Sequence, residues 1–353
     1  MDLMTQELNS LLADRGLVAD GYSFGNAADE LVAARDGTVV APLTDSGLIR
    51  ASGIDAVSFL HNLLTNDIKG ITSGGARFAG LCTAKGRLLA LFLVWREGDD
   101  FLLMLPRDIL PVILKKLSMY VLRSKVKLTD ATAERALIGY SIPAAAAPAP
   151  TFGGAATALV QFGVAAVEGG QAIRLDDTRW LLALDAATAG ARWPQLAVEA
   201  RPVGLAAWQW LEIRAGQPRV VAATQDAFVP QMLNMELPAV AGVSFSKGCY
   251  PGQEIVARTQ YLGKIKRRTY RAGLTVSTVA GTHVYAPETG GQHCGEIVSV
   301  APSPAGGFEC LVCVQISAME AGEVHVGAVD GERLAFLPMP YALEEVPSGD
   351  EIA

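Results

Sequence analysis

The sequence predicts an α+β protein with a small β-barrel at its C-terminal end, and three observations lead to that class. Residues 43–128 alternate strand-like and helix-like segments in an order that favours an antiparallel sheet covered by helices. Residues 269–337 contain short apolar stretches separated by Gly and Pro turns, which is typical of a small all-β barrel. Residues 142–156 are so rich in Pro, Ala and Gly that we expect a linker or loop there rather than part of a core.

The chain has 353 residues, enough for two or three domains with their own cores. The expected parts are a peripheral N-terminal segment (1–37), an α+β domain (38–141), the Pro/Ala-rich linker or loop (142–156), a second α+β region (157–265), a C-terminal β-barrel (266–343) and a disordered acidic tail (344–353).

The first α+β domain is predicted from changes in hydrophobic period along the chain. Residues 45–53 have the pattern of a strand ending in a turn, and residues 54–64 that of a helix with one apolar face. Further strands are expected at 77–82, 87–95, 101–105 and 121–128, and a helix at 109–121. The last of these strands alternates apolar residues with Arg123, Lys125 and Lys127, so we expect it to carry a basic face.

The second α+β region is predicted to lead into a bent loop. Short strands are expected at 159–167, 172–175 and 179–184, followed by a helix at 206–215. The apolar run at residues 239–245 predicts a strand, and a helix is expected from residue 254. The segment between them is therefore predicted to be a strand-to-helix turn, where functional side chains are often placed.

Composition limits the classes of protein that fit. No window has the roughly 18 uninterrupted apolar residues of a membrane-spanning helix, and residues 1–7 lack the pattern of a signal or transit peptide, so we expect a cytoplasmic protein. The net charge of −7 argues against general affinity for nucleic acid or anionic membrane, although it permits a local basic patch. Five widely spaced cysteines indicate reduced thiols rather than a disulfide framework.

Residues 247–254, Lys-Gly-Cys-Tyr-Pro-Gly-Gln-Glu, place more kinds of reactive side chain close together than any other stretch of this chain. Gly248 and Gly252 permit positive φ or a close approach of backbone, and Pro251 fixes its own φ. We therefore expect a bent loop that projects Cys249 and Tyr250.

Cys249 is the leading candidate for a functional residue. A thiol beside Lys247 and exposed backbone amides would be favoured as thiolate and could act as a ligand or nucleophile. The alternative is a small buried hydrophobe, which most free cysteines are. Glu254 and Arg258 are four residues apart in the expected helix and could pair there, although such pairs are usually solvated.

Other patterns are weaker candidates. Cys310 and Cys313 form a Cys-x-x-Cys pattern, but side chains three apart in a strand face opposite sides, so strand packing is the better interpretation. Adjacent His293 and Cys294 give only a weak hint of a metal site, and we predict no metal centre. The basic run at residues 264–268 could contact a polyanion or form a solvated face, and no RNA-binding motif accompanies it.

Residues 247–258 resemble the signature of the YgfZ-type folate-binding proteins, which belong to the same superfamily as the aminomethyltransferase of the glycine cleavage system. The eight-residue motif followed by Ile-Val-Ala-Arg matches that signature without departure. Similarity extends over about residues 40–340. It includes residues 228–234 (Phe-Val-Pro-Gln-Met-Leu-Asn), 43–48, 64–67 and the hairpin at 85–87.

The resemblance implies a three-domain aminomethyltransferase-like fold around a central cavity for tetrahydrofolate or a one-carbon derivative, closed by the C-terminal barrel. It also implies a link to folate-dependent assembly or repair of iron–sulfur clusters in client enzymes, including one that thiolates tRNA. Cys249 takes the place of the functional cysteine, with Lys247 expected to lower its pKa. The residues assigned to folate binding are Tyr250, Gln253, Glu254, Arg258, Arg123, Lys125, Gln231, Asn234 and Arg214.

Two departures from the aminomethyltransferases weaken the reading of this chain as a transferase. Those relatives carry an acidic pair after the hairpin glycines, whereas here Gly86 is followed by Arg87 and an apolar run. They also carry an acid where this chain has Arg214. A missing general acid or base typically costs ~10²–10⁴ in rate.

We therefore expect a monomeric, tetrahydrofolate-binding accessory protein that acts transiently on iron–sulfur client enzymes. The first alternative is a folate-dependent aminomethyltransferase or demethylase-type enzyme, which would turn over a methylamine donor. The second is a tRNA-binding module using the basic residues, whose affinity would fall steeply with salt.

Overall fold

The computed structural model describes residues 12–14, 16–144, 150, 152, 159–263 and 265–343. The chain divides into two compact units. The first unit comprises residues 1–57, 69–77 and 93–209, and the second comprises residues 58–68, 78–92 and 210–353.

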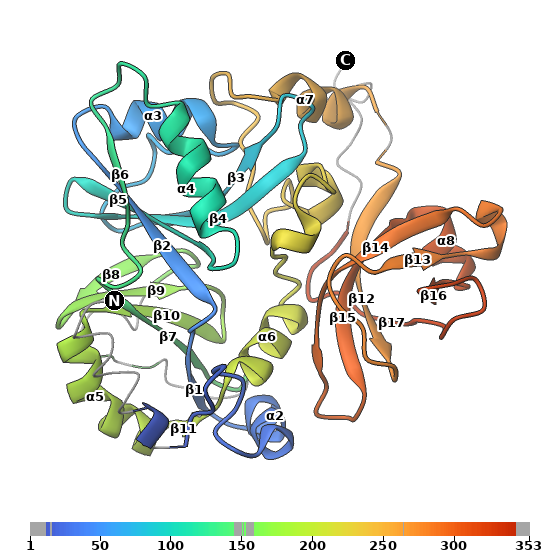
Figure 1. Ribbon diagram of the computed structural model, residues 1–353, viewed down its shortest axis with the longest axis horizontal. Coiled ribbons are helices and arrows are strands. Elements are labelled where there is room, and N and C mark those ends of the chain that lie inside the picture. Colours follow the sequence, from blue (N-terminus) through green and yellow to red (C-terminus); the bar gives the residue numbers. More distant parts are fainter. Residues whose placement is uncertain are drawn as a thin grey trace. The chain divides into compact units, whose positions relative to one another are not determined.

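The first unit contains a six-stranded sheet with the strand order β11-β1-β7-β10-β9-β8 (Figure 1). Its strands pair antiparallel except for β1 and β11, which are parallel. The strand bounds are β1 Val39–Pro42, β7 Ala136–Ser141, β8 Val164–Val167, β9 Gly170–Arg174, β10 Arg179–Leu184 and β11 Arg201–Pro202.

Helix α5 (Ala186–Glu199) packs its apolar stripe into the same core as this sheet. Ala189, Trp193 and Leu196 recur at helical spacing and are buried, and Asp185 caps the helix by accepting from the N–H of Thr188. Helix α5 was not predicted from the sequence, because the helix breakers Gly190 and Pro194 interrupt its pattern. Helix α2 (Ala27–Asp36) begins at an Asn26 cap and lies within the peripheral N-terminal segment.

Strands from both sides of residues 142–156 join in the six-stranded sheet, since β7 precedes that segment and β8 to β10 follow it. Phe152 lies within the segment, yet it is buried and meets the ring of Tyr140 edge-on at 5.1 Å between centroids. This part of the predicted linker therefore contributes to the hydrophobic core. Most of its other residues, and the acidic tail at 344–353, lie outside the described residues.

A five-stranded sheet has the order β3-β4-β5-β2-β6, and it confirms the strand, helix and hairpin pattern predicted for residues 45–119. Its elements are β2 Ser46–Ser52, α3 Ala56–Leu63, β3 Ala76–Cys82, β4 Leu88–Glu97, β5 Asp100–Pro106, α4 Leu110–Met119 and β6 Lys127–Asp130.

The strand predicted at residues 121–128 is wrong over most of its length, because β6 begins only at Lys127. The N–H groups of Tyr120 and Val121 bond back to carbonyls at the end of α4, and the N–H of Ser124 bonds to Val121 O at 2.7 Å. These turn bonds occupy donors that a sheet ladder would need. Leu122 consequently has a φ of 41° and is 89% exposed.

The second unit contains the expected helix at 206–215 only in part, since α6 (Leu205–Arg214) runs across the division of the chain. Between α6 and the C-terminal sheet it has the 3₁₀ turns η2 (Ala222–Thr224) and η3 (Pro230–Leu233) and helix α7 (Gln253–Tyr261). The start of α7 confirms the helix expected from residue 254.

The apolar run at 239–245 is irregular, so the strand predicted there is wrong. Its backbone groups are satisfied one by one rather than by a ladder. Thr65 Oγ1 donates to Gly242 O at 2.6 Å and Asn66 Nδ2 donates to Ala241 O at 2.6 Å. The N–H of Ser244 donates to the carbonyl of Thr65 at 3.0 Å. The two polar residues after α3 therefore hold the chain that leads into the loop at 247–254.

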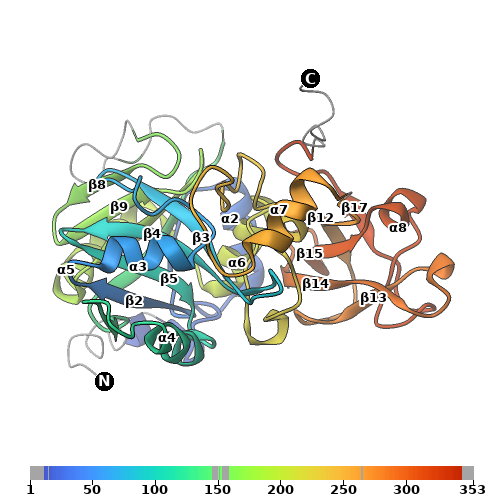
Figure 2. The same ribbon diagram turned by 90° about the horizontal axis from the view of Figure 1, so that it is seen from above.

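The C-terminal sheet has the order β16-β13-β14-β15-β12-β17, and Figures 1 and 2 show its strands curling around a common core. The pairing returns on itself, because His325 of β16 bridges Arg333 and the residues just after Arg333 form β17, which pairs with β12. The expected small barrel is thus confirmed as a curled, barrel-like sheet. Its elements are β12 Arg267–Leu274, β13 His283–Tyr285, η4 Pro287–Thr289, β14 His293–Pro302, β15 Phe308–Gln315, α8 Ile316–Ala321, β16 His325–Val326 and β17 Ala335–Leu337.

No helix within the described ranges has the length and apolar character needed to cross a membrane.

Candidate functional site

The loop at 247–254 is fixed by contact between two glycines of the second unit. Gly252 has a φ of +80°, and a Cβ there would come within 2.3 Å of Thr83 O and 2.6 Å of Gly86 Cα. Gly86, in the β3–β4 hairpin, also has a positive φ of +71°. Only glycine fits at Gly252 without moving backbone. Gly248 differs from this expectation, since its φ is not positive and no heavy atom lies within 4 Å of a Cβ built there.

Lys247 anchors the start of the loop. Its side chain is 9% exposed, and the ammonium donates to the carbonyl oxygens of Leu64, at 2.6 Å, and His61. These carbonyls belong to the C-terminal turn of α3, where a cation is favoured by the helix dipole and by unsatisfied acceptors. The ammonium also lies over the Tyr250 ring, 4.7 Å from the centroid. An effect of Lys247 on the Cys249 thiol stays a prediction.

Tyr250 is buried, so the expectation that the loop projects it is wrong. Burial, with a smaller effect from nearby Cys82, raises the pKa of the Tyr250 phenol. The ring instead fills space beneath the loop and receives the Lys247 cation on its face. Tyr250 therefore acts as an anchor for the loop.

Cys249 is exposed, which excludes the alternative of a buried structural thiol. The other four cysteines, Cys82, Cys294, Cys310 and Cys313, are buried. Burial raises the pKa of the thiols of Cys82, Cys310 and Cys313 to about 12 and that of Cys294 to about 11. Since the thiolate is the reactive form, those four are poor nucleophiles and ligands as they stand. The fold thus presents one cysteine to solvent.

The Cys-x-x-Cys pattern is part of strand β15, and both sulfur-bearing residues are packed in the interior, as strand packing predicted. Among the described residues no group of three or more His, Cys, Asp or Glu side chains is arranged to hold a metal ion.

Gln231 and Asn234 are fully buried and connect η3 to its neighbours. Gln231 Nε2 donates to Val256 O of α7 at 2.7 Å, while its buried Oε1 has no hydrogen-bond partner within the described part of the chain. Asn234 has a φ of 58°, and its Nδ2 donates to Thr269 O of β12 at 2.9 Å. Through these two hydrogen bonds, turn η3 is connected to helix α7 and to strand β12.

A buried ion pair adjoins this turn and was not found from sequence. Arg268 Nη1 lies 2.7 Å from Glu236 Oε1, and it also donates to Asn234 Oδ1 at 3.2 Å. Burial raises the pKa of the Glu236 carboxyl, although the Arg268 charge opposes that shift. No local spacing could have indicated the pair, because the partners are brought together by tertiary packing.

The polar residues of α7 lie mostly at the surface. Gln253 opens the helix, and Glu254 and Arg258 are exposed. No ion pair joins Glu254 to Arg258 in the described structure, so the pairing that their spacing permits is not formed and both side chains are solvated. Arg214, at the end of α6, is also exposed and places its guanidinium 4.9 Å from the centroid of the Trp210 ring.

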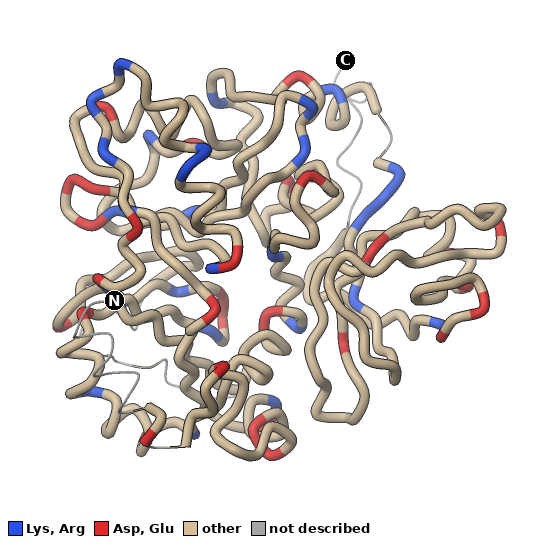
Figure 3. Tube along the Cα trace, in the orientation of Figure 1, with Lys and Arg blue, Asp and Glu red and all other residues tan. Residues whose placement is uncertain are grey.

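Arg123 and Lys125 belong to the first unit and are exposed, in the turn between α4 and β6. Figure 3 shows basic residues of this region on the trace at the upper left of the view. Their role as folate contacts stays a prediction.

The β3–β4 hairpin confirms the absence of an acid after its glycine. Arg87 Nη1 donates to Ala227 O at 2.5 Å, and Leu88 is fully buried. Neither position offers a carboxylate to a bound ligand. An alkyl side chain cannot replace a general acid or base at this place.

No protein-family model matches the sequence. A protein named tRNA-modifying protein YgfZ from Vibrio vulnificus (strain CMCP6) is 32% identical over 242 residues, covering 68% of this chain and 72% of that protein. Another of the same name from Serratia proteamaculans (strain 568) is 30% identical over 312 residues, covering 86% of this chain and 92% of that protein.

Among solved structures, glycine cleavage system aminomethyltransferase T from Bartonella henselae is similar with a TM-score of 0.69. The match covers 95% of this chain and 97% of that one at 17% identity. It confirms the predicted α+β, aminomethyltransferase-like fold.

Proposed function

The chain belongs to the family of the tRNA-modifying protein YgfZ, and from that premise we propose that it is a tetrahydrofolate-binding accessory protein that supports assembly or repair of iron–sulfur clusters in client enzymes. Cys249 is the residue through which it acts. Clients would include enzymes that thiolate tRNA, which connects the proposal to the name carried by the relatives.

The observation that carries the proposal is the exposure of Cys249 on a loop anchored at both ends. Lys247 fastens one end to α3, and Gly252 fastens the other to the Gly86 hairpin. A thiol held on a fixed backbone loses little freedom when it meets a partner, so binding or reaction there is favoured. The four remaining cysteines cannot compete because they are buried.

Side chains of the second unit carry groups that are chemically suited to bind tetrahydrofolate. Exposed Arg258 and Arg214 can pair with the two carboxylates of the ligand's glutamate, since guanidinium and carboxylate form charge-assisted hydrogen bonds. Gln231 is fully buried, so it would support the site by holding η3 against α7 rather than by touching the ligand. When bound, the folate would supply one-carbon chemistry, and the two arginines would orient it.

An active aminomethyltransferase is the less favoured function. The hairpin positions that carry the acidic pair in those relatives are occupied here by Arg87, which is engaged with backbone carbonyls, and by buried Leu88. We therefore expect no turnover of a methylamine donor with tetrahydrofolate.

Calorimetry with tetrahydrofolate and a complementation assay test the proposal together. Cys249→Ser is expected to bind tetrahydrofolate like the wild type, yet fail to restore iron–sulfur enzyme activity in a strain that lacks its own family member. Ser246→Ala, a change at an exposed residue directly before the loop, serves as the matched control and should restore it.

Arg258→Gln supplies the complementary result, with folate affinity lowered by about tenfold for one lost charge-assisted contact. Full complementation by Cys249→Ser would show that the thiol is not required and would refute its proposed role. Absence of tetrahydrofolate binding by the wild type would refute the proposed role of folate.

A further inference from the structure

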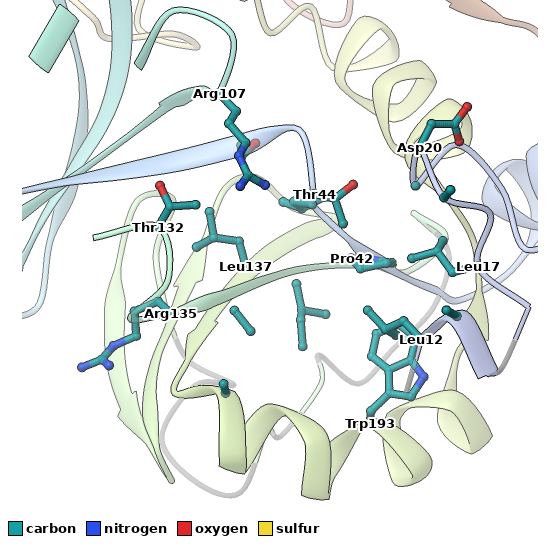
Figure 4. A pocket seen from close by; sticks show the side chains of 18 of the residues that line it. Leu12, Leu17, Asp20, Pro42, Thr44, Arg107, Thr132, Arg135, Leu137 and Trp193 are labelled. Carbon is teal, nitrogen blue, oxygen red and sulfur yellow. The ribbon is translucent and has the colours of Figure 1, made fainter. Parts of the chain in front are cut away.

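The first unit contains a cavity of about 440 Å³, within the size range of small-molecule sites. Its walls come from the N-terminal segment, from β1 and β7, and from α5, and every described residue that lines it belongs to the first unit. The apolar part of the wall is formed by Leu12, Leu17, Pro42, Leu137, Ile138 and Trp193 (Figure 4). No residue proposed above for folate is among them.

One cation at this cavity is available to a ligand. The guanidinium of Arg107 has no ion-pair or hydrogen-bond partner among the described residues, and Figure 4 shows its side chain reaching toward the lining side chains. Arg135 also lines the cavity, but it is bonded to Glu97 at 2.9 Å and points away. Asp20 points away as well, and its Oδ1 accepts from the N–H of Tyr22. Of the charged side chains that line the cavity, Arg107 is therefore the one directed toward its interior in Figure 4.

Two polar atoms of the lining side chains are buried without partners. Thr44 Oγ1 and Trp193 Nε1 make no hydrogen bond with any of the described residues, and Trp193 is fully buried in the core of this unit. Buried polar atoms are normally paired, so either atom could form a hydrogen bond with a ligand that reaches it.

We propose that this cavity binds a small organic acid, with an aromatic or aliphatic body against the apolar wall and its anionic group on Arg107. Apolar contact supplies most of the affinity, while the single guanidinium selects anionic over uncharged compounds of the same shape. This site is separate from the proposed folate function, because none of its residues is needed for that function.

The probe that tests the site is 8-anilinonaphthalene-1-sulfonate, an anion whose fluorescence rises in apolar surroundings. Its uncharged analogue, N-phenyl-1-naphthylamine, has the same ring systems without the sulfonate. For the full chain we expect one binding site and an affinity for the anion about tenfold above that for the analogue, the ratio given by one charge-assisted contact.

Two variants and one control locate the binding. Arg107→Gln should abolish the preference for the anion while leaving the analogue's affinity unchanged. Ala136→Phe, which places a ring in the cavity, should weaken both probes at least tenfold. Arg123→Gln removes an exposed arginine of the same unit that does not line the cavity, and it should change neither affinity.

An unchanged preference for the anion in Arg107→Gln would overturn the proposal. So would unchanged affinity of both probes for an Ala136→Phe protein whose circular dichroism is native. If Ala136→Phe does not fold, the result for Arg107→Gln decides alone, since Arg107 is exposed and its replacement leaves the core intact.

Discussion

Of two glycines in the same loop, only Gly252 should be sensitive to replacement by alanine, while Gly248 should tolerate it. At Gly252 a methyl group would lie 2.3 Å from Thr83 O and 2.6 Å from Gly86 Cα, and both neighbours are backbone. The positive φ of +80° adds strain for any L side chain. At Gly248 neither condition holds.

The loss of unfolding free energy in Gly252→Ala follows from the positive φ and from the steric clash. A non-glycine residue in the left-handed region costs about 1–2 kcal/mol, and forcing an extra methyl group into packed surroundings costs typically about 1–3 kcal/mol. Gly252→Ala should therefore lose about 3 kcal/mol of unfolding free energy. Gly248→Ala should stay within about 0.5 kcal/mol of the wild type, as surface substitutions usually do.

Urea unfolding of the three proteins measures this directly, with the midpoints compared at equal slope. Gly252→Ala should also fail in complementation, because relief of the clash displaces the loop that carries Cys249. Equal stability of the two variants would refute the contact between loop and hairpin as the feature that fixes the site.

Further predictions concern the anchors and pH. Lys247→Met should lower the free energy of unfolding by about 2 kcal/mol, because two buried carbonyls lose their charged donor. The cost of burying the ammonium is only partly recovered in the variant. Equal stability of variant and wild type in urea unfolding would contradict this prediction. Asp176→Asn should destabilise the first unit at pH 7, since Arg179 and hydrogen bonds from Thr178 hold the pKa of the Asp176 carboxyl below its ordinary value. Stability gained from a depressed carboxyl pKa is present at neutral pH and is lost as the pH falls through the folded-state pKa, so the difference between variant and wild type should shrink below about pH 4. A difference that stays constant from pH 7 to about pH 3.5 would exclude that linkage.

The hydrophobic period and the turn residues of a segment were enough to predict its structure where that structure depends mainly on residues nearby in the sequence. The β3–β4 hairpin, α3, α7 and the alternating strands of the barrel were predicted, because period and turn residues set them. Exposure of Cys249 followed in the same way from Gly and Pro in the loop.

Long-range partners explain what the sequence could not predict. Lys247 is bonded to carbonyls 183 and 186 residues away, so its role as an anchor was hidden. The burial of Tyr250 follows from the same packing. Residues 239–245 look like a strand but take their hydrogen bonds from Thr65 and Asn66, which no periodicity reveals.

The most direct measurement of the central claim is alkylation of the native protein with iodoacetamide, followed by mapping of the modified peptides by mass spectrometry. We predict a single carbamidomethyl group, on Cys249, with the other four cysteines modified only after unfolding in urea. Protection of Cys249 in the native state, or comparable modification of any of the other four, would contradict the account.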